Sequence, residues 1–340
     1  MKILFLNVYY GNFLDAHYKR NPDLESWSYD QQLRSLIDTK FGDGGIYSGA
    51  MQRLGWEAED IITNCEPLQR RWAQDRGIPY SHEETMIAQI YEYAPDILYT
   101  QGTWLITQKV YDAVRPHVKL IVGQNASGIN DYRTTRFDMI FTGFLSHVEN
   151  FNKVGVEAHF IPLAFDPSCY VKHDIRDLPL TFVGSLTGAH ERRRKVLEFV
   201  GAKIGLDVWG PQDNFPRGCR YRGEAWGQDM FNILARSEVT LNNHIDLSAS
   251  VVGNMRMFEA TGCGALLVTD WGSNALSLFH DNEVVYYTDP AACVEAIRYY
   301  RQRPKLAREI ARRGQRKTLK DHTYDIRMGV AKRIMEERLK

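Results

Sequence analysis

The stretch SVVGNMRMFEATGCGALLVTD, from Ser250 to Asp270, decides the fold because it combines a short helix with a buried strand. Its second half, Cys263–Asp270, is an apolar run of strand length with glycine near both ends. In its first half Met255 and Phe258 stand three residues apart, and a Gly-Cys-Gly tract follows them. This spacing and this ending predict a helix that leads into the strand.

Arg256 and Glu259 are also three residues apart and would share one face near the start of that helix. Backbone N–H groups lack partners at a helix start, and the helix dipole favours an anion there. Gly253 and Asn254 precede the helix as a cap, so the segment has the outline of a phosphate site. From spacing alone, an exposed Arg–Glu pair on an ordinary crossover helix fits equally well.

Polar side chains also follow the neighbouring apolar run, Val239–Leu241, which predicts another strand. Asn242 and His244 come directly after it. Because parallel strands present their carboxyl ends at one edge of a sheet, these side chains and the helix start should converge on one ligand crevice.

The segments NMRMFEATGCGALLVTD, LFHDNEVVYYTD and GQRKTLKDHTYDIR resemble the donor-binding half of GT-B glycosyltransferases, in particular the group with the CgeB spore-maturation proteins. The resemblance covers roughly residues 175 to 335. It implies an α/β fold of two Rossmann-like domains with parallel sheets that face each other across a cleft. It also implies a nucleoside-diphosphate sugar as donor, with a UDP-sugar as one candidate, and no separate cofactor.

In retaining GT-B families the residue at the position of Glu259 binds the ribose hydroxyls of the donor, and an acidic residue eight positions earlier contacts the sugar. That earlier position holds Val251 in this chain. The resemblance therefore assigns Glu259 to the ribose and leaves open which sugar is carried and whether the reaction retains or inverts.

Composition sets the wider limits. The chain has 340 residues, 42 basic against 42 acidic side chains and 44% hydrophobic positions, as expected of about two globular domains. Zero net charge gives no reason to expect a nucleic-acid partner, and oligomeric state stays open.

No apolar stretch approaches the roughly 18 residues of a spanning helix, so any membrane contact would be peripheral. The single, scattered cysteines favour a cytoplasmic protein; they are Cys65, Cys169, Cys219, Cys263 and Cys293.

Apolar runs separated by helical segments predict a parallel sheet in each half of the chain. We expect an N-terminal acceptor domain at 1–165 with an insertion near 12–41, a donor domain at 166–320, and a helix at 321–340 that crosses back to the first domain. The predicted strands are 2–8, 56–63, 96–100, 119–123, 137–142 and 158–161, then 180–183, 206–209, 239–241, 263–270 and 284–287.

On the acceptor side, the glycine-rich turn 41–45 should bring backbone N–H groups, including those of Gly44 and Gly45, toward a phosphate or a sugar. Such turns are also common as tight connections. Asp43 within the turn is the first candidate for a carboxylate near the reacting hydroxyl. Gln101 and Asn125 stand at the ends of two predicted strands and are further acceptor-side candidates.

His147 is a second candidate for a general base, because it follows a predicted strand directly. Ser146 would cap the helix that continues to Val154. The alternative for His147 is a residue at the helix start that is hydrogen-bonded to its neighbours.

On the donor side, the loop 184–188 and the basic helix after it suit a diphosphate. The resemblance favours Ser185 and one of Arg192 or Arg193 for this role, while a solvated basic helix face is the alternative. The segment 209–212 would lie along the nucleotide base, unless Trp209 serves the core.

These features predict a hexosyltransferase that moves a sugar from a nucleoside-diphosphate sugar to an acceptor hydroxyl. The chain has no Asp-x-Asp motif, so we expect metal-independent catalysis in which Arg256, a basic residue near Arg192 and helix N–H groups stabilise the leaving group. An inverting reaction would use Asp43 or His147 as base, and a retaining one would need no protein base. The alternatives are a nucleotide-sugar epimerase and a non-catalytic nucleotide-sugar-binding protein.

Overall fold

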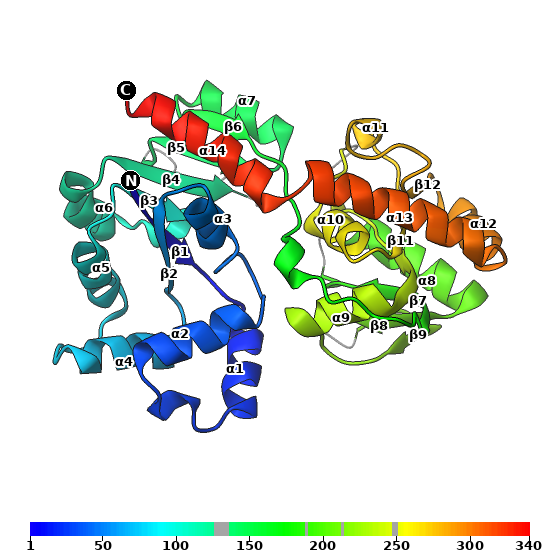
Figure 1. Cartoon of the computed structure of the whole chain (residues 1–340), viewed down its shortest axis with the longest axis horizontal. Helices are drawn as coiled ribbons and strands as arrows, with labels where there is room; N and C mark the ends of the chain where they lie inside the picture. The colour runs from blue at the N-terminus through cyan, green and yellow to red at the C-terminus, as the bar shows by residue number, and fades with distance from the viewer. Residues whose placement is uncertain (126–135, 188–189, 212–213, 247–250) are drawn as a thin grey trace. The chain divides into compact units, whose positions relative to one another are not determined.

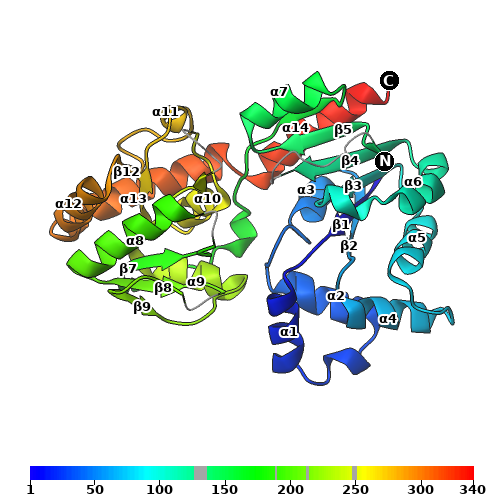
Figure 2. The ribbon, with the colours of Figure 1, turned by 180° about the vertical axis from the view of Figure 1, so that it is seen from behind.

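The computed structural model describes the chain except for residues 126–135, 188–189, 212–213 and 247–250. It divides into two compact units (Figures 1 and 2). Unit 1 comprises Met1–Pro162 together with Tyr324–Lys340, and unit 2 comprises Leu163–Thr323. The chain therefore leaves unit 1, builds unit 2 and returns to unit 1 for its last helix.

Unit 1 is built on six parallel strands in the order β2-β1-β3-β4-β5-β6. A parallel sheet is covered by helices on both faces, so its strands are apolar throughout. The first strand follows this rule, since Ile3 to Leu6 are all buried. The strands are β1 Lys2–Asn7, β2 Glu57–Ile62, β3 Ile97–Thr100, β4 Leu120–Asn125, β5 Met139–Thr142 and β6 Ala158–Phe160.

The helices of unit 1 include the predicted insertion, which forms α1 and α2. A capping box between Ser28 and Gln31 starts α2. The predicted cap at Ser146 is wrong, because α7 begins at Leu145 and no side chain caps it. The α-helices are α1 Gly11–Arg20, α2 Tyr29–Asp38, α3 Tyr47–Arg53, α4 Glu66–Asp75, α5 His82–Tyr93, α6 Gln108–Val114, α7 Leu145–Lys153 and α14 Tyr324–Arg338. The shorter η1 Leu24–Ser26, η2 Thr103–Leu105 and η3 Arg115–His117 complete the unit.

The last helix, α14, packs on α3 of unit 1. Arg53 Nε donates to Asp325 Oδ1 at 2.9 Å, and Lys332 Nζ donates to the carbonyl oxygen of Leu54 at 2.8 Å. The rings of Tyr47 and Tyr324 lie 5.0 Å apart. These contacts make the C-terminal helix part of the unit that the N-terminus begins.

Unit 2 has a second sheet of six parallel strands, in the order β12-β11-β10-β7-β8-β9. Its strands are β7 Leu178–Val183, β8 Leu206–Trp209, β9 Cys219–Tyr221, β10 Ser237–Leu241, β11 Leu266–Asp270 and β12 Val285–Tyr287. Its helices are η5 Pro167–Cys169, α8 Glu191–Ile204, α9 Gln228–Arg236, α10 Met255–Gly262, α11 Ala275–Leu278, α12 Pro290–Arg301 and α13 Pro304–Asp321.

The two ends of unit 2 pair with each other. The amide of Phe165 donates to the carbonyl oxygen of His322 at 2.9 Å, and Phe165 forms a parallel bridge with Thr323. The ring of Phe165 also packs so close to Gly262 that a Cβ there would collide with it. Unit 2 is therefore closed where the chain enters and leaves it.

Each sheet has a point where the chain changes direction across the sheet. In unit 1 the chain runs from β1 to β2 on one side and then to β3 on the other. In unit 2 it runs from β7 outward through β8 and β9 and then returns to β10 on the other side of β7. Ligands of open α/β sheets bind at the carboxyl ends of the strands beside such points. The two places to search are therefore the ends of β1 and β3 and the ends of β7 and β10.

Candidate functional site

The start of α10 lies at the second of these places and is held by a pair of asparagine side chains. Asn254 caps the helix, since its Oδ1 accepts a hydrogen bond from the Met257 amide at 3.1 Å. Asn242, at the end of β10, exchanges two amide hydrogen bonds with Asn254 at 3.0 and 3.1 Å. Asn242 also donates to Thr269 Oγ1 at 3.0 Å. Asn242 and Asn254, which were both predicted to contact the donor, thus hold the start of α10 against the sheet.

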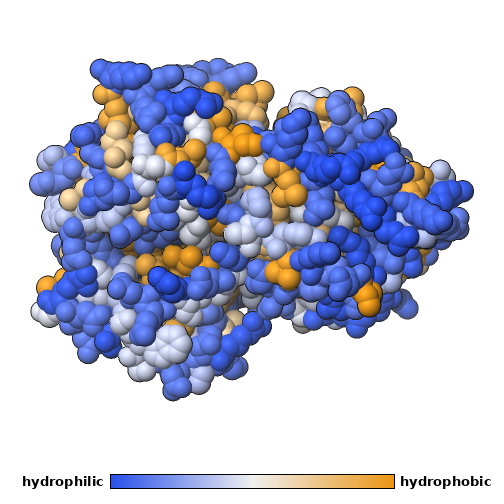
Figure 3. Space-filling model, in the orientation of Figure 1, coloured by the Kyte–Doolittle hydropathy of each residue, from blue (hydrophilic) through white to orange (hydrophobic). Residues whose placement is uncertain are grey.

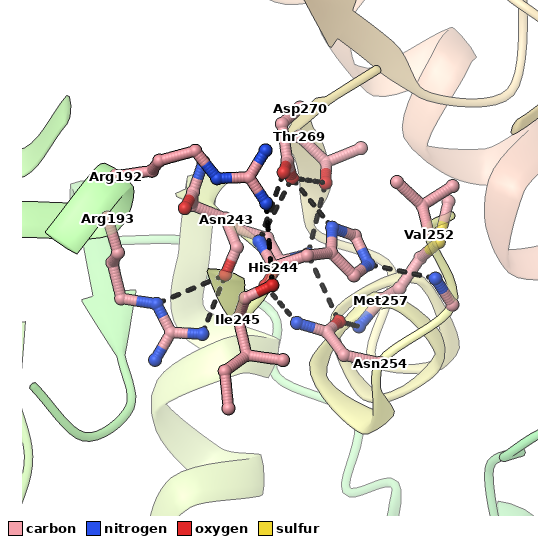
Figure 4. A network of polar contacts seen from close by, with 12 residues as sticks. Arg192, Arg193, Asn243, His244, Ile245, Val252, Asn254, Met257, Thr269 and Asp270 are labelled. Carbon is pink, nitrogen blue, oxygen red and sulfur yellow. Dashed lines mark hydrogen bonds and ion pairs between the residues drawn. The ribbon is translucent and has the colours of Figure 1, made fainter. Parts of the chain in front are cut away.

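His244 connects three segments at this edge of the sheet (Figure 4). Its ring is 2% exposed, and its Nδ1 lies 2.7 Å from Asp270 Oδ1. Its Nε2 accepts a hydrogen bond from the Gly253 amide at 2.8 Å. Because Nε2 accepts, the proton sits on Nδ1 and the ring is neutral. Burial raises the pKa of Asp270, but the hydrogen bonds from His244 outweigh it and hold that pKa below its usual value.

The loop before α10 is fixed by backbone geometry as well. Gly253 has a φ of +130°, a conformation that side-chain-bearing residues rarely adopt. Asn274 binds the backbone of Val252, the residue before Gly253. Its Oδ1 accepts from the Val252 amide and its Nδ2 donates to the Val252 carbonyl oxygen, both at 2.8 Å. Val252, the residue after Val251, is therefore held in place by two hydrogen bonds.

We expect His244→Ala to lower the free energy of unfolding by about 1–3 kcal/mol, because the Gly253 amide and Asp270 lose a partner inside the protein. His244→Gln should recover part of the loss, since its amide oxygen can accept from the same backbone N–H. Urea denaturation measures both, with His280→Ala at an exposed position as control. Equal stability of His244→Ala and the wild type would contradict the role assigned to this ring.

Arg256 and Glu259 form a largely buried ion pair. The Arg256 side chain is 18% exposed and that of Glu259 is 8% exposed, with Nη1 and Oε2 2.6 Å apart. Arg256 Nε donates to the carbonyl oxygen of Val183, the last residue of β7, at 2.9 Å. Burial raises the pKa of Glu259, and the neighbouring Arg256 opposes this rise. The alternative of an exposed pair on a crossover helix is therefore wrong.

Arg193, on α8, connects the segments that follow β7 and β10. Its Nη1 donates to the carbonyl oxygen of Ser185 at 2.8 Å. Its Nη2 and Nε donate to the carbonyl oxygen of Asn243 at 2.7 and 3.1 Å (Figure 4). Burial lowers the pKa of Arg193 to about 10, so the guanidinium stays charged at neutral pH. Within the described residues, its hydrogen bonds go only to backbone oxygens. Ser185 thus contributes its carbonyl group to this bridge.

Asn243 presents an unused acceptor beside this arginine. Its side chain is buried and its Nδ2 donates to Tyr287 Oη at 3.1 Å. Its Oδ1 is buried and has no hydrogen-bond partner among the residues that the structure describes. A buried polar atom without a partner costs about 1–3 kcal/mol, so a ligand that donates to it would relieve that cost.

Arg192 points to an acid of the protein itself. Its Nε lies 3.1 Å from Asp246 Oδ1, and the amide of Glu191 donates to Asp246 Oδ2 at 2.7 Å. The carboxylate of Asp246 therefore occupies the start of α8, where a diphosphate was expected. Gly188 of the preceding loop and Gln212 of the predicted base-binding segment lie outside the described residues.

In unit 1, Asp43 and Gln101 meet at the ends of β1 and β3. Gln101 Nε2 donates to Asp43 Oδ2, and its Oε1 accepts from the amide of Val8 at 3.1 Å. Tyr9 lies directly beneath the glycine turn, and a Cβ at Gly44 would collide with its hydroxyl group. The amide of Gly45 donates to Asp60 Oδ2 at 3.0 Å, so this N–H is already used inside the protein.

His147 and Asn125 form a second polar group on the same sheet edge. His147 Nδ1 lies 3.1 Å from Asn125 Oδ1, and the ring is buried. Because Asn125 Oδ1 accepts, Nδ1 carries the proton and Nε2 keeps its lone pair. Burial also lowers the pKa of His147. The ring of His147 thus binds a strand end, while its backbone amide donates to the carbonyl oxygen of Phe144 at the helix start at 3.0 Å. No hydrogen bond among the described residues joins His147 and Asn125 to Asp43.

Three acids of these sites were not expected from the sequence: Asp60, Asp246 and Asp270. Asp270 ends β11, so the rule that selected Asn242 and His244 at the end of β10 would have found it. Asp60 lies within β2 and is buried against Asn7 and Ser48, which no sequence pattern indicates.

The described residues contain no group of three or more His, Cys, Asp or Glu side chains arranged to hold a metal ion. Among the same residues, no helix has the length and apolar content needed to cross a membrane.

Residues 192–333 match a protein-family model described as glycosyl transferase-like. A search of curated protein sequences found no match. Solved structures with similar folds include Anabaena HepE in complex with UDP-glucose, with 10% identity, a TM-score of 0.63 and coverage of 99% of this chain and 100% of that one.

AviGT4, a glycosyltransferase of avilamycin A biosynthesis, is 14% identical with a TM-score of 0.62, covering 100% of this chain and 98% of that one. Sucrose-phosphate synthase from Thermosynechococcus elongatus is 11% identical with a TM-score of 0.59, covering 99% and 98%. Together with the two parallel sheets, these matches show that the chain has the α/β GT-B fold.

Proposed function

We propose that this protein is a glycosyltransferase that moves a sugar from a nucleoside-diphosphate sugar to an acceptor hydroxyl, and that it belongs to the CgeB-like group. The observation that carries the proposal is the buried Arg256–Glu259 pair beside the end of β7, within the segment that matches the glycosyl transferase-like model. The complex of HepE with UDP-glucose supports a UDP-sugar as donor. Single cysteines without disulfide partners suit an enzyme of the reducing cytoplasm.

In this proposal unit 2 binds the donor. Glu259 holds Arg256 with Oε2, and its other carboxylate oxygen accepts from the ribose hydroxyls. Arg256 Nη2 makes no hydrogen bond within the described part of the chain, so it can donate to the diphosphate. Arg193 lies close enough to Arg256 for their charges to repel each other, which a bound diphosphate would offset.

The leaving group is a nucleoside diphosphate whose negative charge grows as the glycosidic bond breaks. We assign its stabilisation to the guanidinium groups of Arg256 and Arg193, which are fixed in place before the reaction by hydrogen bonds to strand and loop carbonyl groups. No divalent metal is required in this scheme. Arg192 contributes only if Asp246 releases it.

In an inverting reaction, either Asp43 or His147 accepts the proton of the acceptor hydroxyl. Loss of the base should lower kcat by about 10²- to 10⁴-fold, so Asp43→Asn and His147→Gln identify it by which variant shows that loss. The lowered pKa of His147 keeps its ring neutral at mildly acidic pH. If His147 is the base, the rate should therefore persist below pH ~6.5, the ordinary His value, and fall only at lower pH. Full activity of both variants would indicate a retaining course without a protein base.

The proposal is tested by incubating the pure protein with a panel of nucleotide-sugars and measuring nucleotide release, with and without candidate acceptors and with and without EDTA. Acceptor-dependent release that EDTA leaves unchanged is the expected result. An isomerised sugar would identify an epimerase instead. Tight binding without turnover on any donor and acceptor would identify a non-catalytic binding protein.

A further inference from the structure

The C-terminal part of unit 2 concentrates positive charge. Between Arg298 and Lys320 the sequence has ten lysines and arginines and a single acid, Glu309. Because the whole chain is neutral, the rest of it carries an equal excess of negative charge. The segment covers the end of α12 and nearly all of α13, so the charge is confined to one region of the fold.

Five of these cations form one row along α13, here called the basic row: Lys305, Arg308, Arg312, Arg316 and Lys320. Their spacing of three or four residues puts them on one face of the helix. All five are exposed, while Ala307, Ile310 and Ala311 on the opposite face are buried in the core. In Figure 3 the surface over α13 of Figure 1 is deep blue. The row extends about 22 Å along the helix at 1.5 Å per residue.

The basic row differs from the other cations of the same helix in its partners. Arg313 pairs with Glu309, and Lys317 pairs with Asp321 at 2.9 Å. Within the described residues, the five members of the basic row form no ion pair and no side-chain hydrogen bond. Among the described residues, the helix thus separates cations that form ion pairs from a row of exposed cations that form none.

We propose that the basic row docks this protein on an anionic lipid surface. A membrane is flat, so all five cations of the row, which share one face of α13, can reach it together. Their unpaired positive charge complements the negative surface potential of anionic lipids. Leu319, the residue before Lys320, is exposed and suits the interfacial region of a bilayer.

The test is co-sedimentation of the full chain with vesicles of phosphatidylcholine alone and of phosphatidylcholine with phosphatidylglycerol. Each cation near an anionic surface contributes about fivefold to partitioning. Reversing Arg312 and Arg316 to Glu should therefore weaken binding to the anionic vesicles by at least about 25-fold. Raising the salt concentration to about 1 M, where the Debye length is about 3 Å, should release the wild type.

The matched control is the double reversal Lys195→Glu with Arg217→Glu, two exposed positions elsewhere in unit 2. It changes the net charge by the same amount and should bind anionic vesicles nearly as well as the wild type. Thermal denaturation checks that both variants are folded. The proposal is overturned if the wild type does not bind anionic vesicles, or if it binds a soluble polyanion such as heparin but not vesicles. It is also overturned if both double variants lose vesicle binding equally. None of these outcomes bears on sugar transfer, which the nucleotide-release assay decides separately.

Discussion

Glu259→Gln is expected to weaken binding of the nucleoside diphosphate by about 10- to 100-fold and to leave the fold intact. A hydrogen bond to a charged group contributes about 1.5–3 kcal/mol, and the substitution replaces the carboxylate that is proposed to bind the ribose. The amide oxygen of Gln can still accept from Arg256 Nη1, which now lies 2.6 Å from Oε2. Calorimetry with UDP measures the affinity, and thermal denaturation measures the fold.

The matched control for this substitution is Glu309→Gln. Glu309 also pairs with an arginine on its own helix, but both side chains are largely exposed. Exposed pairs contribute little to stability, and α13 lies outside the proposed donor site. UDP affinity should therefore be unchanged in this variant. An unchanged affinity in Glu259→Gln as well would remove the ribose role from Glu259.

Arg256→Ala should have the larger effect, because it acts on both stability and turnover. Removing one partner of a buried ion pair costs about 3–5 kcal/mol, since Glu259 would remain buried and charged without its partner. Loss of a preorganised donor to the leaving group should lower kcat by about 10²- to 10³-fold. Urea denaturation and nucleotide-release kinetics measure the two effects separately.

The double variant Arg256→Ala with Glu259→Gln separates the effect of Arg256 on stability from its effect on turnover. It removes the orphaned charge, so part of the lost stability should return. Turnover should not return, because the guanidinium is still absent. If the double variant regained turnover together with stability, Arg256 would be a structural residue only, and the leaving group would be stabilised elsewhere.

The strands of both sheets could be predicted from the sequence because parallel strands are continuous apolar runs between polar ends. β8 begins and ends where its pattern predicts, at Leu206–Trp209. β9, Cys219–Tyr221, was missed because it has three residues at the edge of the sheet and two of them are exposed. α6 was missed because it is short and only Val110 and Val114 of it are buried.

The site could be predicted less completely than the fold. The rule that polar residues follow strand ends predicted that Asn242, His244 and the helix start at Asn254 converge, and hydrogen bonds join these segments. Whether such a side chain faces a ligand or another side chain depends on partners 9 to 27 residues away, such as Gly253 and Asp270 for His244 and Thr269 for Asn242. Local spacing does not specify those pairings. The contact between Arg256 and Glu259 could be predicted directly from the sequence, because the two residues are three apart on one helix.

The pairing of Phe165 with His322 and Thr323 has an evolutionary consequence. Because the entry and exit of residues 163–323 lie side by side, that block is joined to its host by two adjacent strands of chain, as an inserted domain is. Recombination at these two points would transfer a complete sheet, with its own ligand edge, in one event. α14 would stay with unit 1, so an exchange of residues 163–323 would leave the first sheet and its C-terminal helix unchanged.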